Sequence, residues 1–318
     1  MNELRIKYLL AIFLIGTGAF FISCDDEEVA AHFNRGNAYQ EEGRFNEAIL
    51  AYKKAIEIDS DFAEAHYNLG NAYYRQGQID EAALAYRNAI RIQPDFVEAR
   101  NSLGLVYRIQ ENNAEAIVQL EEAVRIAPDN AQAYNHLGRS YMEQDKFEAA
   151  VAAFEKAIEL NPDSAYACYY LGNAYKAQGK LDQAIAAYQK AVAISPHDAL
   201  SHHNLGISLY DQNRFDEAIT HFEAAVRISP SLANLHNNLG NAYKAQGKLD
   251  EAVAAFERAA NVNPGDAKAY YNLGIIYAER GGDGEAMTQY KRALQLARTN
   301  PDLQELIPEI EGRMNKLK

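Results

Sequence analysis

Residues 171–182 read LGNAYKAQGKLD, and the same twelve letters return at residues 239–250. The two copies lie 68 residues apart, which is twice a shorter period of 34 residues that runs through most of this 318-residue chain. A fixed period of about 20–50 residues is the signature of a solenoid built from stacked repeats. Glycine marks the period eight times without a slip, at Gly36, Gly70, Gly104, Gly138, Gly172, Gly206, Gly240 and Gly274.

Each repeat contains two amphipathic helices when its positions are numbered so that the glycine is position 8. Small or apolar residues at positions 3, 7, 10 and 11 share one side of a first helix, and alanine at 20 and 27 with a large apolar residue at 24 marks a second. Position 15 is glycine, asparagine or aspartate, which tolerate the left-handed backbone that ends a helix, except at Glu111. A helical glycine costs about 1 kcal/mol relative to alanine, so we expect the two helices to cross closest at position 8.

This pattern resembles the tetratricopeptide repeat (TPR) family, with its aromatic-x2-Leu-Gly-x2-Tyr motif, its Ala-x3-aromatic motif and its late proline. The repeats are similar to those of the TPR region of O-GlcNAc transferase. The resemblance implies an all-α fold, a right-handed superhelical α-solenoid of eight helix-turn-helix TPR units with a C-terminal capping helix in 301–318. The implied repeats are 29–62, 63–96, 97–130, 131–164, 165–198, 199–232, 233–266 and 267–300.

The first 24 residues differ in kind from the repeats. Arg5 and Lys7 precede an uncharged run over residues 8–22, which is the form of a secretory signal. Cys24 at the end of that run resembles the lipidated cysteine of a bacterial TPR lipoprotein; an uncleaved membrane anchor and a simple cleaved signal are the alternatives. Residues 25–28 are predicted to be a short acidic linker. Basic charge before the run and acid after it predict an extracytoplasmic, membrane-associated protein on the periplasmic side.

Composition argues against several classes of function. A formal net charge of −13 and a pI near 5.1 disfavour nucleic acid, whose binding is dominated by lysine and arginine. The thiol of Cys168 has the position of a small buried residue. His202 and His236 occupy a position that takes bulky packing residues, and no HExxH, cysteine-pair or phosphate-loop motif accompanies them. We therefore expect no enzyme activity, no cofactor, no metal and no small-molecule substrate.

A column of asparagines marks the candidate binding surface. Positions 2, 5, 6, 9, 12 and 13 form the exposed stripe of each first helix, which lines the concave peptide groove in the family. An amide pairs with both the C=O and the N–H of a peptide; the alternative is that asparagine merely fills a solvated stripe. The predicted groove residues are Asn34, Asn37, Asn68, Asn71, Asn173, Asn204, Asn238, Asn241 and Asn272, with Tyr67, Tyr169 and Tyr271 supplying side-chain pockets or packing between repeats.

The column is interrupted at Ser102, His136 and Tyr170. The carboxylate clamp of some TPR adaptors is not expected, because the bases on the stripe, such as Arg108 and Arg139, are scattered along the sequence rather than paired. These features predict a non-catalytic scaffold that binds a partner protein or extended peptide and helps to assemble or regulate an extracytoplasmic membrane complex. The alternatives are a structural subunit that self-associates without a groove ligand, and a regulatory array for an enzyme on another chain.

Overall fold

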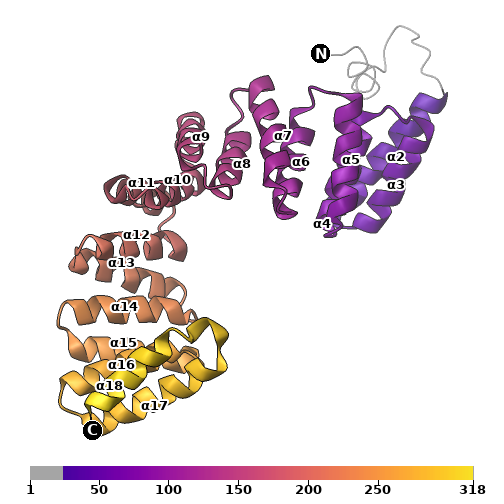
Figure 1. Cartoon of the computed structure of the whole chain (residues 1–318). Coiled ribbons are helices and arrows are strands. Elements are labelled where there is room, and N and C mark those ends of the chain that lie inside the picture. The colour runs from indigo at the N-terminus through magenta and orange to yellow at the C-terminus, as the bar shows by residue number, and fades with distance from the viewer. Residues whose placement is uncertain (1–23, 318) are drawn as a thin grey trace. The chain divides into compact units, whose positions relative to one another are not determined.

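The computed structural model describes residues 24–317, which form helices joined by short turns and contain no strand (Figure 1). The first helices of the repeats are α2 (Cys24–Glu41), α4 (Ala63–Arg75), α6 (Val97–Ile109), α8 (Ala131–Met142), α10 (Ala165–Ala177), α12 (Ala199–Asp211), α14 (Ala233–Ala245) and α16 (Ala267–Glu279). The second helices are α3 (Phe45–Ile58), α5 (Ile79–Ile92), α7 (Asn113–Ile126), α9 (Phe147–Leu160), α11 (Leu181–Ile194), α13 (Phe215–Ile228), α15 (Leu249–Val262) and α17 (Asp283–Thr299).

The predicted helix-turn-helix solenoid is confirmed. Seven first helices, from α4 to α16, begin at the first residue of their predicted repeat. The exception is α2, which already includes residues 25–28, so the predicted acidic linker is wrong and this segment is helical. Asp25, Asp26 and Glu27 lie in the first turn of α2, where negative charge is favourable beside the positive end of the helix dipole.

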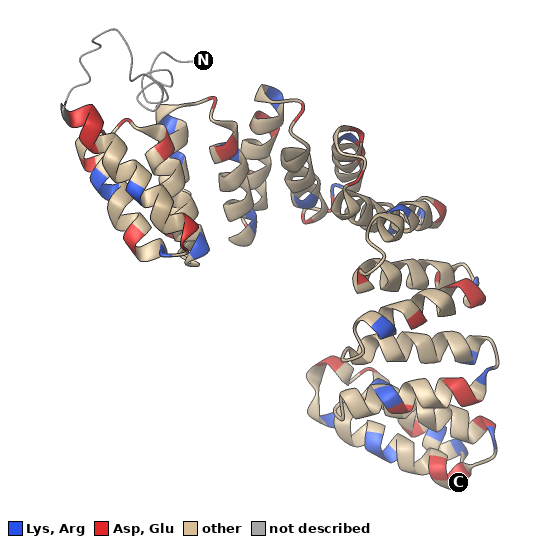
Figure 2. Cartoon of the chain, turned by 180° about the vertical axis from the view of Figure 1, so that it is seen from behind, with Lys and Arg blue, Asp and Glu red and all other residues tan. Residues whose placement is uncertain are grey.

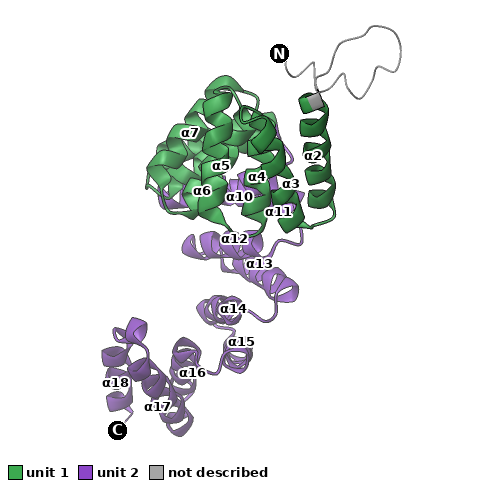
Figure 3. Ribbon diagram, turned by 90° about the vertical axis from the view of Figure 1, so that its right-hand side faces the viewer, with its two compact units in different colours: residues 1–160 green, residues 161–318 purple. Residues whose placement is uncertain are grey.

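The chain divides into two compact units, residues 1–160 and 161–318 (Figure 3). The described part of unit 1 holds α2 to α9, and unit 2 holds α10 to α18. Within each unit, the two helices of a repeat pack together and the second helix packs on the first helix of the next repeat. Residues of both charge signs are distributed over the helices of each unit (Figure 2).

The position-8 glycines lie at the closest approach of the two helices in every repeat. A Cβ atom built on Gly172 would lie 2.5 Å from Cε1 of Tyr188, and one on Gly104 would lie 2.5 Å from Cγ of Leu120. Tyr188 and Leu120 are fully buried, so they have no room to move away. The predicted close crossing is confirmed.

The end repeats depart from the pattern for physical reasons. In α2, the side chains of Ala31, Arg35 and Ala38 at positions 3, 7 and 10 are exposed, whereas these positions are buried in most later repeats, where a preceding second helix packs on them. Arg35 at position 7 of the first repeat is therefore tolerated, because its charge is not buried.

At the other end, a short 3-10 helix, η1 (Pro301–Leu303), leads into α18 (Leu306–Lys316), which packs on α17. Ile310 is fully buried in the apolar cluster of the eighth repeat. Pro308 lies in the first turn of α18, where its missing N–H leaves no helical hydrogen bond unmade. The tail thus places its apolar residues against the face that a ninth repeat would otherwise cover.

We predict that Gly172→Ala destabilises unit 2 by about 1–3 kcal/mol, because the new methyl group forces the buried ring of Tyr188 out of its place. Chemical denaturation followed by circular dichroism measures the change. Gly312→Ala in α18 is the matched control, since nothing lies within 4 Å of its Cβ position. That variant is expected to gain up to about 1 kcal/mol from helix propensity, and an equal loss in both variants would refute the crossing argument.

Candidate functional site

The position-9 asparagines are tied to the core by tyrosine hydroxyls. The buried side chains of Tyr52 and Tyr188 each donate to the Oδ1 atom of the asparagine in the same repeat, at 2.8 Å to Asn37 and 2.6 Å to Asn173. Tyr86 donates to Asn71 in the same way, at 2.8 Å. Burial raises the pKa of these phenols, so they stay protonated and act as donors. One acceptor of each amide is therefore already engaged within the repeat.

The position-6 asparagines join neighbouring repeats. Asn68 donates to the Oδ1 atom of Asn37 at 2.9 Å, across 31 residues of sequence. Asn204 donates to Asn173 at 3.2 Å and to the hydroxyl of Tyr169 at 3.0 Å. The predicted column is thus in part an inter-repeat hydrogen-bond network, which neither reading of the sequence anticipated.

A third inter-repeat bond involves a histidine instead of a tyrosine. The amide nitrogen of Asn238 lies 2.7 Å from Nε2 of His203. An amide nitrogen only donates, so that ring nitrogen is the acceptor and the imidazole is neutral. Burial, together with the charge of Lys176, lowers the pKa of His203 and keeps it in this state.

Three predicted asparagines keep their amides uncommitted. Asn34, Asn241 and Asn272 make no side-chain hydrogen bond to any described residue. Asn34 is exposed, whereas Asn241 and Asn272 are half-buried. Asn241 differs from the other position-9 asparagines because its repeat carries Phe256 in place of a tyrosine, so no hydroxyl reaches it.

The predicted tyrosines lie mostly in packing contacts. The Tyr67 ring centroid is 5.0 Å from that of Phe96, and the Tyr169 ring is 5.0 Å from that of Tyr170. Tyr271 is buried and donates to Glu309 of α18. The interpretation of Tyr271 as a groove pocket is therefore wrong, because the C-terminal helix already covers it.

The histidines at position 4 bind backbone carbonyls. The Nε2 atom of His202 lies 3.2 Å from the carbonyl oxygen of Pro196, and His236 makes the same contact with Pro230 at 2.9 Å. Because Nε2 of His202 donates, its Nδ1 atom accepts from Nδ1 of His221 at 3.0 Å. These contacts fit the packing role, and the described residues contain no group of three or more potential metal ligands.

The structure describes the side chain of only one of the two cysteines. Cys168 is fully buried and unpaired, and burial raises the pKa of its thiol, which disfavours the nucleophilic thiolate. The Cys24 backbone begins α2, but its side chain and residues 1–23 lie outside the described residues. Its lipidation stays a prediction.

Two arginines that seem scattered in the sequence meet in the structure. Arg108 on α6 donates from Nη1 to Oε1 of Glu143 on α8 at 2.9 Å, and Arg139 reaches the same oxygen at 3.5 Å. Only 13% of the Arg108 side chain is exposed. The separations of 35 and 4 residues are the signals that could have revealed this cluster, because the first is close to one repeat and the second is one helical turn.

Comparison with known proteins agrees with this geometry. The sequence matches the family described as TPR repeat over residues 36–77 and 70–108, and the family described as Cilia and flagella-associated protein 70 C-terminal domain over residues 96–307. The chain belongs to the tetratricopeptide repeat family. No curated protein matches the sequence of this TPR protein.

Solved structures share the TPR fold. MamA is 25% identical, with 51% of this chain and 95% of MamA covered and a TM-score of 0.50. YrrB, described as a TPR protein with an unusual peptide-binding site, is 24% identical over 57% of this chain and 93% of its own, with a TM-score of 0.50. Pseudomonas aeruginosa PilF is 20% identical over 66% and 96%, with a TM-score of 0.58.

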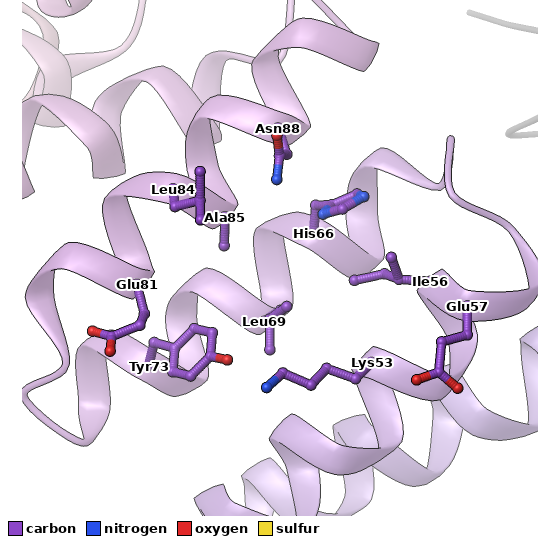
Figure 4. Close-up of a pocket in the computed structure, with 10 residues that line it drawn as sticks. All are labelled: Lys53, Ile56, Glu57, His66, Leu69, Tyr73, Glu81, Leu84, Ala85 and Asn88. Atoms are coloured by element: carbon purple, nitrogen blue, oxygen red, sulfur yellow. The ribbon is translucent and has the colours of Figure 1, made fainter.

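A pocket of about 320 Å³ is lined by side chains of α3, α4 and α5 of this TPR protein (Figure 4). Ile56, Leu69 and Leu84 contribute apolar side chains to its lining. Leu84 is 53% exposed, and Leu50 and Val118 at the same position of the flanking repeats are 62% and 59% exposed. None of the predicted groove residues lines this pocket, so the unit 1 surface has a second, apolar feature.

We predict a pH-dependent contribution to TPR stability from His136. Burial, with Arg108 and Arg139 beside it, lowers the pKa of His136 to about 4, below the value of about 6.5 in an unfolded chain. The neutral ring therefore contributes stability that is complete above pH 6.5 and is lost as the pH falls towards 4. Between pH 7.5 and 5.0 the loss is expected to be on the order of 1 kcal/mol larger in the native protein than in His136→Gln.

Urea denaturation at the two pH values measures this difference. His197→Gln, at an exposed histidine, is the control and should keep the native pH dependence. Identical pH dependence in the native protein and in His136→Gln would contradict the burial argument.

Proposed function

We propose that this TPR chain is a non-catalytic scaffold that binds an extended segment of a partner protein along the exposed face of its first helices. The observation that carries the proposal is the pair of half-buried, uncommitted amides of Asn241 and Asn272 on α14 and α16. They are 31 residues apart, the same separation as the hydrogen-bonded pair Asn37 and Asn68. Asn241 and Asn272 therefore occupy the equivalent positions on two adjacent repeats.

Main-chain recognition suits this chemistry. Each free amide offers one acceptor and two donors, and a peptide backbone presents a donor and an acceptor at every residue. A half-buried setting strengthens such bonds relative to open water. The family fold supports the proposal, since stacked repeats present equivalent side chains on one extended surface.

We further propose an extracytoplasmic, membrane-associated location, with the array tethered through its N-terminal segment or through lipid on Cys24. The order of charges around residues 8–22 supports it. Among the helices of residues 24–317, none combines the length and apolar character that crossing a bilayer requires. Assembly or regulation of a membrane complex is the role that fits such a tethered scaffold.

We predict that the protein recovered from cell membranes starts at Cys24 and carries lipid, because the leader ends at that residue. Intact-mass measurement tests this. Cys24→Ser should abolish the lipid mass and keep residues 1–23. An unmodified start near residue 24 would indicate a simple cleaved signal, a full-length mass an uncleaved anchor, and a full-length protein confined to the cytosol would refute the location.

We predict that Asn241→Ala combined with Asn272→Ala reduces partner capture about 10- to 100-fold. Each substitution leaves a partner group unpaired, which costs about 1–3 kcal/mol in a partly buried site. Crosslinking in intact cells followed by pulldown identifies the partner and measures the yield. Melting should be unchanged, since these amides make no hydrogen bond to the described residues.

Two controls give the experiment its direction. Asn261→Ala, at an exposed residue of α15, should leave capture intact. Asn204→Ala should lower stability as well, because it breaks bonds to the preceding repeat. Undiminished capture by the double variant would move the contact elsewhere, and recovery of a second copy of this chain alone would favour self-association, for which the exposed Leu50 and Leu84 offer a surface.

A further inference from the structure

The second helices of unit 1 expose large apolar side chains at one position of the repeat. Position 22 is alanine or threonine in the last five repeats. In the first three repeats it is Leu50, Leu84 and Val118, each more than half exposed. These residues lie on α3, α5 and α7, one repeat apart and within unit 1. Because they recur at the period of the repeat, they form a regular apolar surface of unit 1 and not a scatter of single exposed residues.

The pocket lined by α3, α4 and α5 lies on this apolar surface. Leu84 forms part of its lining, together with Lys53 and Tyr73. A second hollow of about 530 Å³ adjoins the pocket, since Lys53, Tyr73 and Glu81 line both of them. Leu50 lines this second hollow. The same surface of unit 1 therefore carries both exposed leucines and hollows beside them that can receive a side chain.

A carboxylate that other repeats place at this surface is missing in the first repeat. In three repeats the glutamate at position 25 accepts a hydrogen bond from the tyrosine at position 11 of the next repeat; these glutamates are Glu121, Glu223 and Glu257. In the first repeat, position 25 is Lys53, whose ammonium lies 5.6 Å from the ring centroid of Tyr73. The Tyr73 hydroxyl makes no hydrogen bond to any described residue, and Lys53 forms no ion pair with one. A cation and a hydroxyl donor thus stand together with no carboxylate bound to either.

The same surface also carries carboxylates without a cation. Glu57 and Glu81 line the pocket, and neither forms an ion pair with a residue in the described part of the chain. Figure 4 shows the Lys53 side chain directed toward Tyr73, with Glu57 and Glu81 at opposite ends of the pocket. A ligand of one charge sign would match one set of these groups and be repelled by the other. A complementary partner therefore presents both charge signs together with an apolar residue.

We propose that this surface of α3 and α5 binds the same surface of a second copy of the chain. A second copy brings an exposed leucine, a cation and a carboxylate in one arrangement, and in an isologous interface each residue meets its complement twice about a two-fold axis. Leu50 of one copy enters the pocket of the other, and Lys53 with the Tyr73 hydroxyl receives the carboxylate of Glu81 from the other copy. None of the predicted groove residues lines the pocket, so the first helices of both copies stay free for the proposed function.

Sedimentation of the purified full chain in a non-ionic detergent, over a wide range of concentration, tests the proposal. We expect an equilibrium between monomer and dimer. Leu84→Glu should raise the dissociation constant of the dimer about 10- to 100-fold, because two carboxylates would then be buried against apolar side chains. Ala254→Glu is the matched control, at the exposed position 22 of the seventh repeat, and should leave the equilibrium unchanged. An equal effect of the two variants overturns the proposal.

An exchange of charges tests the pairing of Lys53 with Glu81. Lys53→Glu and Glu81→Lys should each weaken self-association about tenfold, since the symmetry repeats each like-charge contact. A mixture of these two variants should form a heterodimer within about threefold of the native affinity, a gain that misfolding cannot produce. Lys54→Glu, at an exposed neighbour that does not line the pocket, should give no such recovery when mixed with Glu81→Lys. Weakening in both single variants without recovery in their mixture overturns the proposal.

Other occupants of the surface give different results. A dimer that persists in Leu84→Glu and depends on residues 1–23 would place the contact in the leader and overturn the proposal. A monomer at every concentration also overturns it, whether the surface then binds a lipid bilayer or another protein. Neither result bears on capture through Asn241 and Asn272, so the groove function is tested separately.

Discussion

The contact between the position-8 glycine and the side chain at position 24 is the constraint on which the rest of each repeat depends. An added Cβ would lie 2.5–2.8 Å from a ring atom in seven repeats and from Leu120 in the third. The two helices can therefore approach this closely only where glycine stands. Because the glycine fixes the ring against the first helix, the hydroxyl of a tyrosine ring emerges beside the next residue, position 9. The surface amide and the core ring are thus parts of one arrangement.

The sequence determined the fold almost completely because the fold depends on local periodicity. The first residues of the seven first helices from α4 to α16 follow from the 34-residue period of the sequence. The turn after the first helix is left-handed in every repeat, and Glu111, the one residue unsuited to it, nevertheless adopts a φ of 62°. The register of the repeat therefore overrides the preference of one residue. The start of α2 was not predicted, because acidic residues are typical both of a linker and of the first turn of a helix.

The candidate site could be predicted only in part from the sequence, because hydrogen-bond partners depend on distances between side chains of neighbouring repeats. The sequence shows the asparagine column. It does not show that Asn37 and Asn173 each accept two hydrogen bonds, one from a tyrosine of the same repeat and one from an asparagine of the next. A separation of 15 residues between asparagine and tyrosine would have been the signal for the first bond, and one of 31 residues for the second. Arg108 and Arg139 looked unrelated because their link runs through Glu143, a third residue that carries no motif.

The residue at position 24 also determines where the residue at position 9, on the exposed stripe of the first helix, can vary. Three of the four tyrosine repeats place asparagine at position 9, where it accepts the hydroxyl. In the fourth, position 9 is Ile275, and the hydroxyl of Tyr290 is left buried without a partner, which shows the cost of breaking the pairing. Repeats with leucine or phenylalanine at position 24 carry no such demand, and there position 9 is Leu105, Arg139, Ile207 or Asn241. Asn241 therefore stands in a repeat where the core has lost a hydroxyl, so one oxygen atom in the interior distinguishes its uncommitted amide from the position-9 asparagines that accept a tyrosine hydroxyl.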